Sequence, residues 1–133
     1  MEDDSQILFV YGSLRPAVAR GEPLRLVADL EQLGSASVPG DLYDLGDYPG
    51  MVAGGGRVWG DLLRVSDPER FDQLDDYEEC GGRRPLFHRV QLIARRTDGS
   101  SCRAWVYLYA GSVAGGRYLP EGDYVAFLNE RPS

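Results

Sequence analysis

The sequence predicts an α+β domain built on a strongly curved β-sheet or a small barrel. Segments with strand character outnumber helical ones, most of them are joined by short turns, and two segments carry helix signals. The chain has 133 residues, the length of one domain, and its hydrophobic fraction of 43% is enough for a core. We therefore expect residues 1–133 to form one folded domain rather than a disordered chain.

The first predicted elements are a strand and a helix. Residues 6–11 (QILFVY) are apolar and rich in strand formers, which predicts a short buried strand. Pro23 suits the start of a helix whose apolar residues run at helical spacing to Leu33, with Gly34 as its cap. Residues 32–38 also fit a strand, so both interpretations stand for that segment.

Turn residues interrupt the middle of the chain. The predicted turns are Pro39-Gly40, residues 47–50 and residues 54–56. A short strand around Leu42 and Tyr43 separates the first two turns, and a longer strand over residues 57–65 follows the third.

The next predicted element is a helix that begins within residues 66–69 (SDPE). Ser66 and Glu69 match a capping box, and Pro68 suits the first turn. We expect this helix to end near residues 76–77, before a loop rich in glycine and arginine.

Two long strands follow, over residues 87–96 and 101–109. Asp98-Gly99 lies between them and predicts a hairpin turn. The last apolar segment, residues 124–128, fits either a strand or a helix.

The composition argues against several classes of function. The formal charge of −7 repels phosphate backbones, so we expect binding neither to nucleic acid nor to anionic membranes. All 14 basic residues are arginine, which excludes a Schiff-base lysine and a phosphate-loop lysine. The apolar runs fall short of the roughly 20 residues of a membrane span, and the acidic start, MEDDSQ, is a poor secretory signal.

Cysteine and histidine are scarce. Cys80, Cys102 and His88 are the only residues of these types, which is too few for a four-ligand zinc site. We expect reduced thiols in a cytoplasmic protein with neither metal nor cofactor. Glutamates before Cys80 disfavour a reactive thiolate, and a lone strand histidine is more often structural than catalytic.

An acidic cluster lies at the C-terminal end of the second predicted helix. Five carboxylates fall within eight residues: Asp72, Asp75, Asp76, Glu78 and Glu79. Most are expected to be solvated, and their spacing does not match an EF-hand. Acidic side chains near a helix C-terminus oppose the helix dipole, which is weak evidence that one of them has another role.

The segment FVYGSLR, residues 9–15, ends the first strand. A glycine there lets the backbone turn sharply and leaves amides uncovered, and Ser13 adds a hydroxyl donor. Such N–H groups form an anion site, although a plain tight turn capped by Ser13 is the alternative. Arg15 is a candidate bidentate partner for a substrate carboxylate, or else a solvated arginine. Arg89, on an alternating strand, is expected to form a structural ion pair.

Taken together, the motifs are more specific than any one of them. In chain order they are VYGSLR, LYDLGDYPGMV, VWGDLLRV, LDDYE, FHR and AWVY. This order resembles the γ-glutamylcyclotransferase-like family, which includes small γ-glutamylamine cyclotransferases, plant avirulence-induced proteins and the butirosin-pathway cyclotransferase. The resemblance covers about residues 7–128, and YGSL with LDDYE is its most diagnostic part. Two positions depart from the family pattern: Glu79 stands where glycine is common, and Phe87 where tyrosine is common.

The resemblance implies a small mixed, strongly curved β-barrel with two or three short helices and a pocket between the YGSL loop and the acidic motif. By position in the motifs, Glu78 is the catalytic acid/base, and the backbone amides of Tyr11, Gly12, Ser13 and Leu14 hold the substrate. The implied activity is a cofactor-independent reaction of lyase or acyltransferase type. It cyclises a γ-glutamyl amine or peptide to 5-oxoproline and releases the amine.

This reaction requires Glu78 to act as a base near neutral pH. A free glutamate is a weak base, so we expect its pKa to be raised toward roughly 6 or 7. Burial beside Tyr77 and Phe87, with repulsion from Asp76 and Glu79, is expected to raise it. A non-catalytic small-molecule-binding module and a related amide hydrolase are the alternative functions. The leaving amine and the oligomeric state are left open by the sequence.

Overall fold

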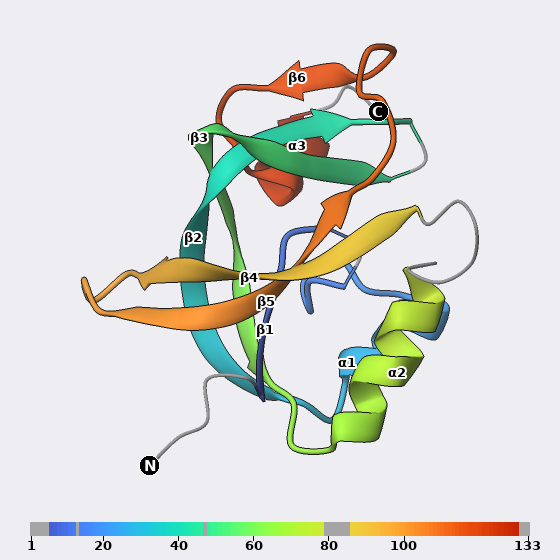
Figure 1. Cartoon of the computed structure of the whole chain (residues 1–133), viewed down its shortest axis with the longest axis vertical. Helices are drawn as coiled ribbons and strands as arrows, with labels where there is room; N and C mark the ends of the chain where they lie inside the picture. Colours follow the sequence, from blue (N-terminus) through green and yellow to red (C-terminus); the bar gives the residue numbers. More distant parts are fainter. Residues whose placement is uncertain (1–5, 13, 47, 79–85, 131–133) are drawn as a thin grey trace.

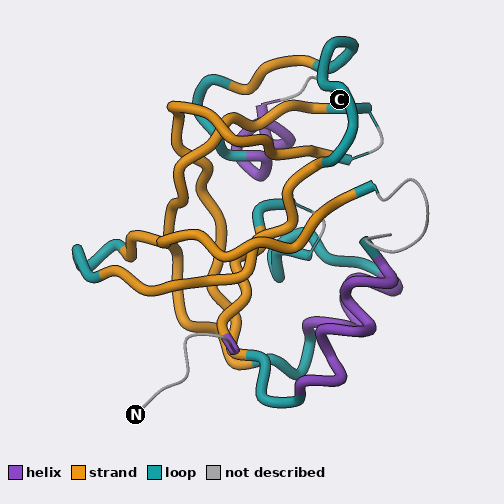
Figure 2. The backbone as a smooth tube through the Cα atoms, in the orientation of Figure 1, coloured by secondary structure: helices purple, strands orange, loops and turns teal. Residues whose placement is uncertain are grey.

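The computed structural model describes residues 6–12, 14–46, 48–78 and 86–130. Figure 1 labels the helices and strands, and Figure 2 shows the same backbone coloured by secondary structure. The elements in chain order are β1 (Ile7–Val10), α1 (Gly21–Val27), β2 (Glu31–Asp44), β3 (Pro49–Arg64), α2 (Pro68–Tyr77), β4 (Phe87–Arg96), β5 (Ser101–Tyr109), β6 (Arg117–Leu119) and α3 (Tyr124–Glu130).

Within the described residues, five strands close into a barrel. The strand order is β3-β1-β5-β4-β2-β6, and a further pairing of β2 with β3 closes the ring, so β6 is an addition on the side of β2. The pairing of β1 with β5 is parallel and the others are antiparallel, which makes the barrel mixed. The β4–β5 hairpin crosses the long strands β2 and β3, while α1 and α2 lie together on one side (Figure 1). The predicted fold class is confirmed.

Strand β1 is buried on both of its faces. Ile7 and Phe9 belong to the apolar cluster inside the barrel, whereas Leu8 and Val10 belong to a second cluster between the barrel wall and the helices. Since side chains alternate between the two faces of a strand, both faces must be apolar. This explains why QILFVY shows no polar alternation.

The β4–β5 hairpin has two different faces. Ala104 and Val106 point into the barrel, whereas Phe87 and Tyr107 pack in the outer cluster against α2. Both strands have the bounds predicted from the sequence. Gly99 has the positive φ of 90° that a tight turn demands.

Two predicted turns are wrong, because the long strands bend there instead of ending. Strand β2 continues through Pro39-Gly40, and residues 53–56 lie inside β3. The register passes from Pro39 paired with Arg57 to Asp41 paired with Val52, which leaves residues 53–56 bulged out opposite Gly40. Bulges of this kind increase local twist and curvature, which a small barrel requires.

The helix ends also differ in detail from the predictions. Helix α1 is short and β2 begins at Glu31, so the strand interpretation of residues 32–38 is correct. The N-cap of α2 is Asp67 rather than Ser66, because the Asp67 carboxylate accepts a hydrogen bond of 3.0 Å from the Glu69 N–H.

The C-terminal elements resolve one ambiguous prediction and include one strand that was not predicted. The segment that begins at Tyr124 is the helix α3, and Tyr124 packs into the cluster inside the barrel. The three-residue strand β6 has no prediction corresponding to it.

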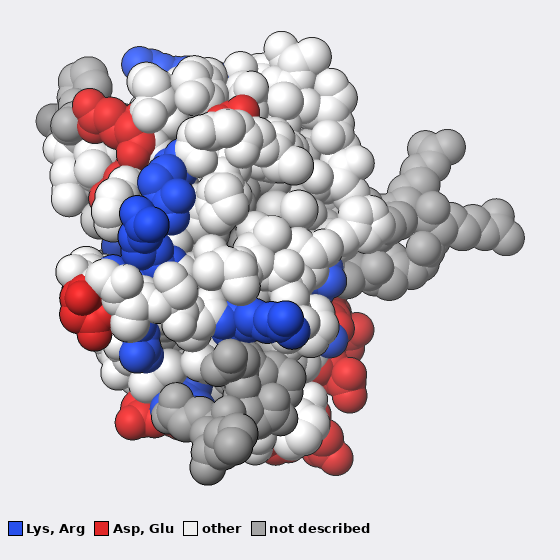
Figure 3. Space-filling model, turned by 60° about the vertical axis from the view of Figure 1, so that its left-hand side comes forward, with Lys and Arg blue, Asp and Glu red and all other residues white. Residues whose placement is uncertain are grey.

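The described surface carries charges of both signs. On the face shown in Figure 3, arginine side chains lie in short stretches bordered by uncharged and acidic residues. In the described part of the chain, no helix is long and apolar enough to cross a membrane.

Candidate active site

A pocket of about 250 Å³ lies where β1 ends, between the C-terminus of α2 and the outer face of β4 and β5. Its lining residues are Phe9, Val10, Tyr11, Gly12, Leu14, Tyr48, Pro49, Tyr77, Glu78, Leu86, Phe87 and Tyr107. Of the predicted site residues, Tyr11, Gly12, Leu14 and Glu78 are therefore brought together. Ser13 lies outside the described residues, and so do Glu79 and Cys80.

The backbone after β1 turns at once. The Gly12 carbonyl accepts a hydrogen bond of 2.9 Å from the Arg15 N–H, which closes the turn. A Cβ on Gly12 would lie 2.5 Å from the Pro49 Cγ, so the close approach of Pro49 requires glycine. Leu14 is buried in the outer cluster and anchors the far side of the turn.

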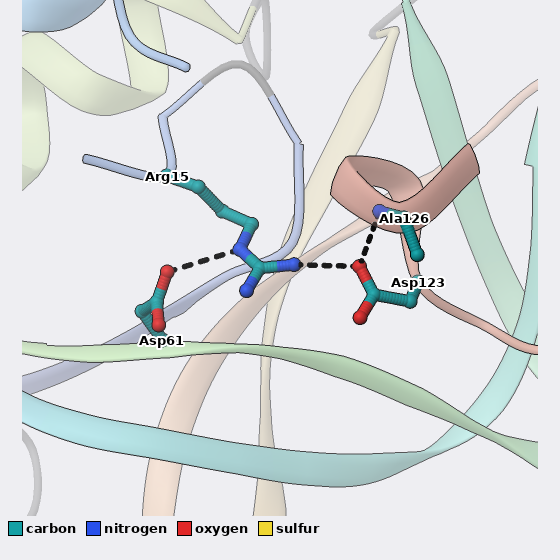
Figure 4. A network of polar contacts seen from close by, with 4 residues as sticks. All are labelled: Arg15, Asp61, Asp123 and Ala126. Carbon is teal, nitrogen blue, oxygen red and sulfur yellow. Dashed lines mark hydrogen bonds and ion pairs between the residues drawn. The ribbon is translucent and has the colours of Figure 1, made fainter. Parts of the chain in front are cut away.

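Arg15 does not line the pocket, and its side chain is largely buried against two carboxylates, so neither alternative for it, a partner of a substrate carboxylate or a solvated arginine, is observed. Its Nε donates to Asp61 Oδ2 at 3.0 Å, and its Nη1 donates to Asp123 Oδ1 at 3.1 Å (Figure 4). The same Asp123 oxygen accepts the Ala126 N–H at the start of α3. Arg15 therefore joins the turn after β1 to β3 and α3.

Tyr11 links the end of β1 to two neighbouring strands. Its hydroxyl donates to the Tyr107 carbonyl at 2.6 Å and accepts from the Met51 N–H at 3.2 Å. Burial raises the pKa of the Tyr11 phenol well above its ordinary value, and the nearby charge of Glu78 raises it further. Tyr11 is thus a neutral, doubly hydrogen-bonded side chain in the pocket wall.

Glu78 is the C-cap residue directly after helix α2. Its N–H donates to the Leu74 carbonyl at 2.9 Å, which keeps it on the last turn. Phe71, Leu74 and Glu78 recur at helical spacing, so the stripe that packs Phe71 and Leu74 into the outer cluster also directs Glu78 toward the barrel.

The Glu78 carboxyl is partly buried among aromatic rings. Burial raises its pKa from the ordinary value of 4.5 to about 7, within the range expected from the sequence. Tyr77 and Phe87 line the same pocket. The expected repulsion from Asp76 adds nothing to the shift, because that side chain is exposed to water.

Tyr48 and Pro49 line the pocket, although no sequence signal placed them there. Tyr48 packs against Phe87 with ring centroids 6.0 Å apart, and Tyr109 lies against both rings. The alternation of β4 and β5 indicates which side chains share the outer face, but no local signal indicates that residues 48–49 reach it.

The positions of Arg89 and His88 on the β4–β5 hairpin test two other predictions. Arg89 forms the expected ion pair, with Asp75 of α2 as its partner, its Nε lying 2.8 Å from Asp75 Oδ1. His88 is exposed and does not line the pocket, as expected for a residue without a catalytic role.

The arrangement combines a carboxyl group that ionises near neutrality with a sharply turned strand end. A carboxyl of this pKa can accept a proton and return it at physiological pH. The backbone at the end of β1, Tyr11 and Gly12, lines the pocket beside this carboxyl. These are the parts of an acid/base site.

The chain is similar to known proteins over nearly its whole length. Residues 8–126 match the family described as "Gamma-glutamyl cyclotransferase, AIG2-like". The chain is 34% identical over 119 residues to the gamma-glutamylcyclotransferase family protein YtfP of Escherichia coli strain K12, covering 89% of this chain and 95% of that protein. It is 32% identical over 105 residues to gamma-L-glutamyl-butirosin B gamma-glutamyl cyclotransferase of Niallia circulans, covering 77% and 65% of the two chains.

Solved structures share the fold. The crystal structure of an AIG2-like protein from Mus musculus has a TM-score of 0.71 and 21% sequence identity, covering 86% of each chain. At that identity the likeness supports the barrel architecture alone, while the family match and the two relatives decide the kinship. The resemblance stated from the motifs is confirmed, and the chain belongs to the gamma-glutamyl cyclotransferase, AIG2-like family, which includes gamma-glutamyl cyclotransferase enzymes.

Proposed function

We propose that this protein cyclises a γ-glutamyl amine or peptide to 5-oxoproline and releases the free amine, with Glu78 as general acid/base. The observation that carries the proposal is the position of Glu78, a carboxyl with a pKa of about 7 in the same pocket as Tyr11, Gly12 and Leu14. The family membership supports the reaction class.

The substrate carries both reacting groups, so the pocket needs only to bring them together. The α-amine of the glutamyl group attacks its own γ-carbonyl carbon and forms a five-membered lactam. A pocket that holds the glutamyl group curled supplies proximity, which contributes several kcal/mol in well-oriented intramolecular reactions. The pocket volume of about 250 Å³ is compatible with a ligand of this kind.

The protons balance with a single shuttle. The α-ammonium has three protons, of which one remains on the lactam nitrogen and two are lost. Glu78 must be ionised to accept one proton from the α-nitrogen, and it then delivers that proton to the departing nitrogen as the C–N bond breaks; the second proton is lost from the α-ammonium to water, and the released amine takes one up from water. A pKa of about 7 serves both steps, because the group is neither too weak a base nor too weak an acid.

The strand end supplies the binding half of the proposed mechanism. The backbone amides of Tyr11, Gly12, Ser13 and Leu14 would hold the α-carboxylate or stabilise the oxyanion that forms at the γ-carbonyl. Tyr11, Gly12 and Leu14 line the pocket together with Glu78, which supports this role.

The test is a mass-spectrometric screen of γ-glutamyl amines and dipeptides for 5-oxoproline. We expect one class of substrate to be cyclised and the Glu78→Gln variant to be slower by about 10²–10⁴-fold, the usual cost of losing a positioned acid/base. Free glutamate as the product would indicate an amide hydrolase, and binding without turnover would indicate a binding module. Equal rates for the two proteins would overturn the assignment of Glu78.

A further inference from the structure

We propose that Asp75, held by Arg89 and Tyr107, is a positioning residue that sets the place of Glu78 opposite the turn after β1. We call these three residues the Asp75 clamp. Its catalytic consequence rests on the proposed function, whereas its effect on Glu78 does not. Asp75 itself does not line the pocket.

The clamp begins with a two-point ion pair. Arg89 Nε donates to Asp75 Oδ1 at 2.8 Å, and Arg89 Nη2 donates to Asp75 Oδ2 at 3.1 Å. The guanidinium carbon also lies 4.6 Å from the centroid of the Phe71 ring and 4.4 Å from that of Trp105. Two parallel hydrogen bonds with rings alongside restrict the guanidinium far more than an ordinary surface ion pair does.

Tyr107 extends the clamp to the other half of the site. Its hydroxyl donates to Asp75 Oδ1 at 2.7 Å, and its carbonyl accepts the hydrogen bond from the Tyr11 hydroxyl. Tyr107 and Arg89 are directly paired in the β4–β5 ladder, so both reach Asp75 from one rigid surface. The last turn of α2 and the end of β1 are therefore connected through β5.

The position of Asp75 on the helix explains why this connection matters for Glu78. Residues three apart share a helix face, and Asp75 precedes Glu78 by three. The last turn of a helix has unsatisfied carbonyls, and α2 has no basic residue there. Arg89 supplies from β4 the positive charge that the acidic helix end lacks, which accounts for a sequence feature that opposes the helix dipole.

The test measures the titration of Glu78 directly, without a substrate. In ¹³C-glutamate-labelled protein, the Glu78 carboxyl signal is assigned by its absence in Glu78→Gln and followed across pH. The titratable groups that line the pocket with it, among the described residues, are the phenols of Tyr11, Tyr48, Tyr77 and Tyr107. The signal is that of the Glu78 carboxyl carbon, so it reports on Glu78 itself.

We expect Asp75→Asn to lower the Glu78 pKa by about one unit or more, because a loosened helix end admits water. With a substrate in hand, kcat should fall about 10–100-fold while KM changes little. Asp76→Asn is the matched control, since it removes the same charge from the same helix at an exposed position. It should leave both the titration and the rate unchanged.

Tyr107→Phe is a second test of the clamp, for use if the Asp75→Asn protein does not fold. It removes one hydrogen bond to Asp75 and keeps the ring and the backbone carbonyl, so we expect a smaller shift of the Glu78 pKa in the same direction. A folded Asp75→Asn or Tyr107→Phe protein with the wild-type titration overturns the positioning role. A shifted titration in a protein that forms no 5-oxoproline overturns the proposed function and leaves the clamp standing.

Discussion

The two sides of the pocket are each tied down by an arginine, but in different ways. Arg15, behind the turn after β1, joins two carboxylates, Asp61 and Asp123, through one hydrogen bond each. Arg89, behind the end of α2, binds the single carboxylate of Asp75 through two hydrogen bonds. Arg15 thus connects three segments of the chain, whereas Arg89 orients one helix turn.

The difference follows from what each side needs. The turn after β1 is already defined locally, by the hydrogen bond from the Arg15 N–H to the Gly12 carbonyl and by the contact with Pro49. A helix end has no comparable local constraint, because its last turn lacks intrahelical partners. We therefore expect substitutions in the Asp75 clamp to change the pKa and the reactivity of Glu78. Substitutions of Arg15 should instead change the stability of the protein and the binding of substrate.

The largest expected effect is the dependence of activity on pH. Since Glu78 must be ionised to accept a proton and burial raises its pKa to about 7, kcat/KM should fall about tenfold per pH unit below 7. Initial rates of 5-oxoproline formation between pH 4.5 and 8.5 measure this. An acidic limb near pH 4.5 would contradict the burial of Glu78 in the working enzyme. The Asp75→Asn protein should move the limb toward that value, and an Arg15 variant should not.

The second effect concerns the pH dependence of the free energy of unfolding, and it arises from the Glu78 carboxyl rather than from the rest of α2. A raised pKa in the folded state means that the native protein retains a proton which the unfolded chain loses above about pH 4.5. Stability from this group is fully present below pH 4.5 and is lost as the pH rises through about 7. Glu78→Gln should therefore raise the free energy of unfolding by roughly 1–3 kcal/mol at pH 8.

Urea denaturation of both proteins at pH 8 and pH 4.5 checks that prediction. At pH 4.5 the two free energies of unfolding should agree closely, because both side chains are then uncharged in the native state. A Glu78→Gln protein that is less stable than the wild type at pH 8 would mean that the carboxylate is held by favourable contacts rather than merely buried.

The smallest expected effect belongs to Arg15. Arg15→Met removes the cation that Asp61 and Asp123 share. Since these groups are partly buried, we expect the free energy of unfolding to fall by about 1–3 kcal/mol. The matched control is Arg64→Met, because its partner, Glu31, is 63% exposed and such pairs contribute about 0–1 kcal/mol. Thermal and urea denaturation measure both, and a loss for Arg15→Met no larger than that for Arg64→Met would remove the distinction.

Much of the fold was predictable from local sequence signals. Alternation and the Asp98-Gly99 turn predicted the β4–β5 hairpin with its bounds, and Pro68 marked the first turn of α2. The turns predicted at residues 39–40 and 54–56 were wrong, because glycine signals a backbone irregularity without saying whether a strand ends or bulges there. Curvature depends on closing the barrel, which is a non-local requirement.

The candidate site was predictable in part. The motif resemblance pointed to residues 11–14 and to Glu78, and the structure brings all the described members of that set into one pocket. The residues themselves did not indicate that Asp75 differs from the other acidic side chains of its cluster. Its partners lie 14 and 32 residues away in the chain, so no local spacing reveals them.

The sequence by itself determined the first strand, the two strands of the β4–β5 hairpin and the start of the second helix, and it contains one motif carboxylate and a glycine turn. Those features arise from side-chain periodicity, turn chemistry and capping, which act over a few residues. Only the tertiary structure decided that Arg15 serves the scaffold, that Asp75 is clamped by Arg89 and Tyr107, and that Glu78 is buried enough to titrate near pH 7. The physical reason is that ion pairing and desolvation depend on what surrounds a group in space, and its neighbours along the chain do not specify those surroundings.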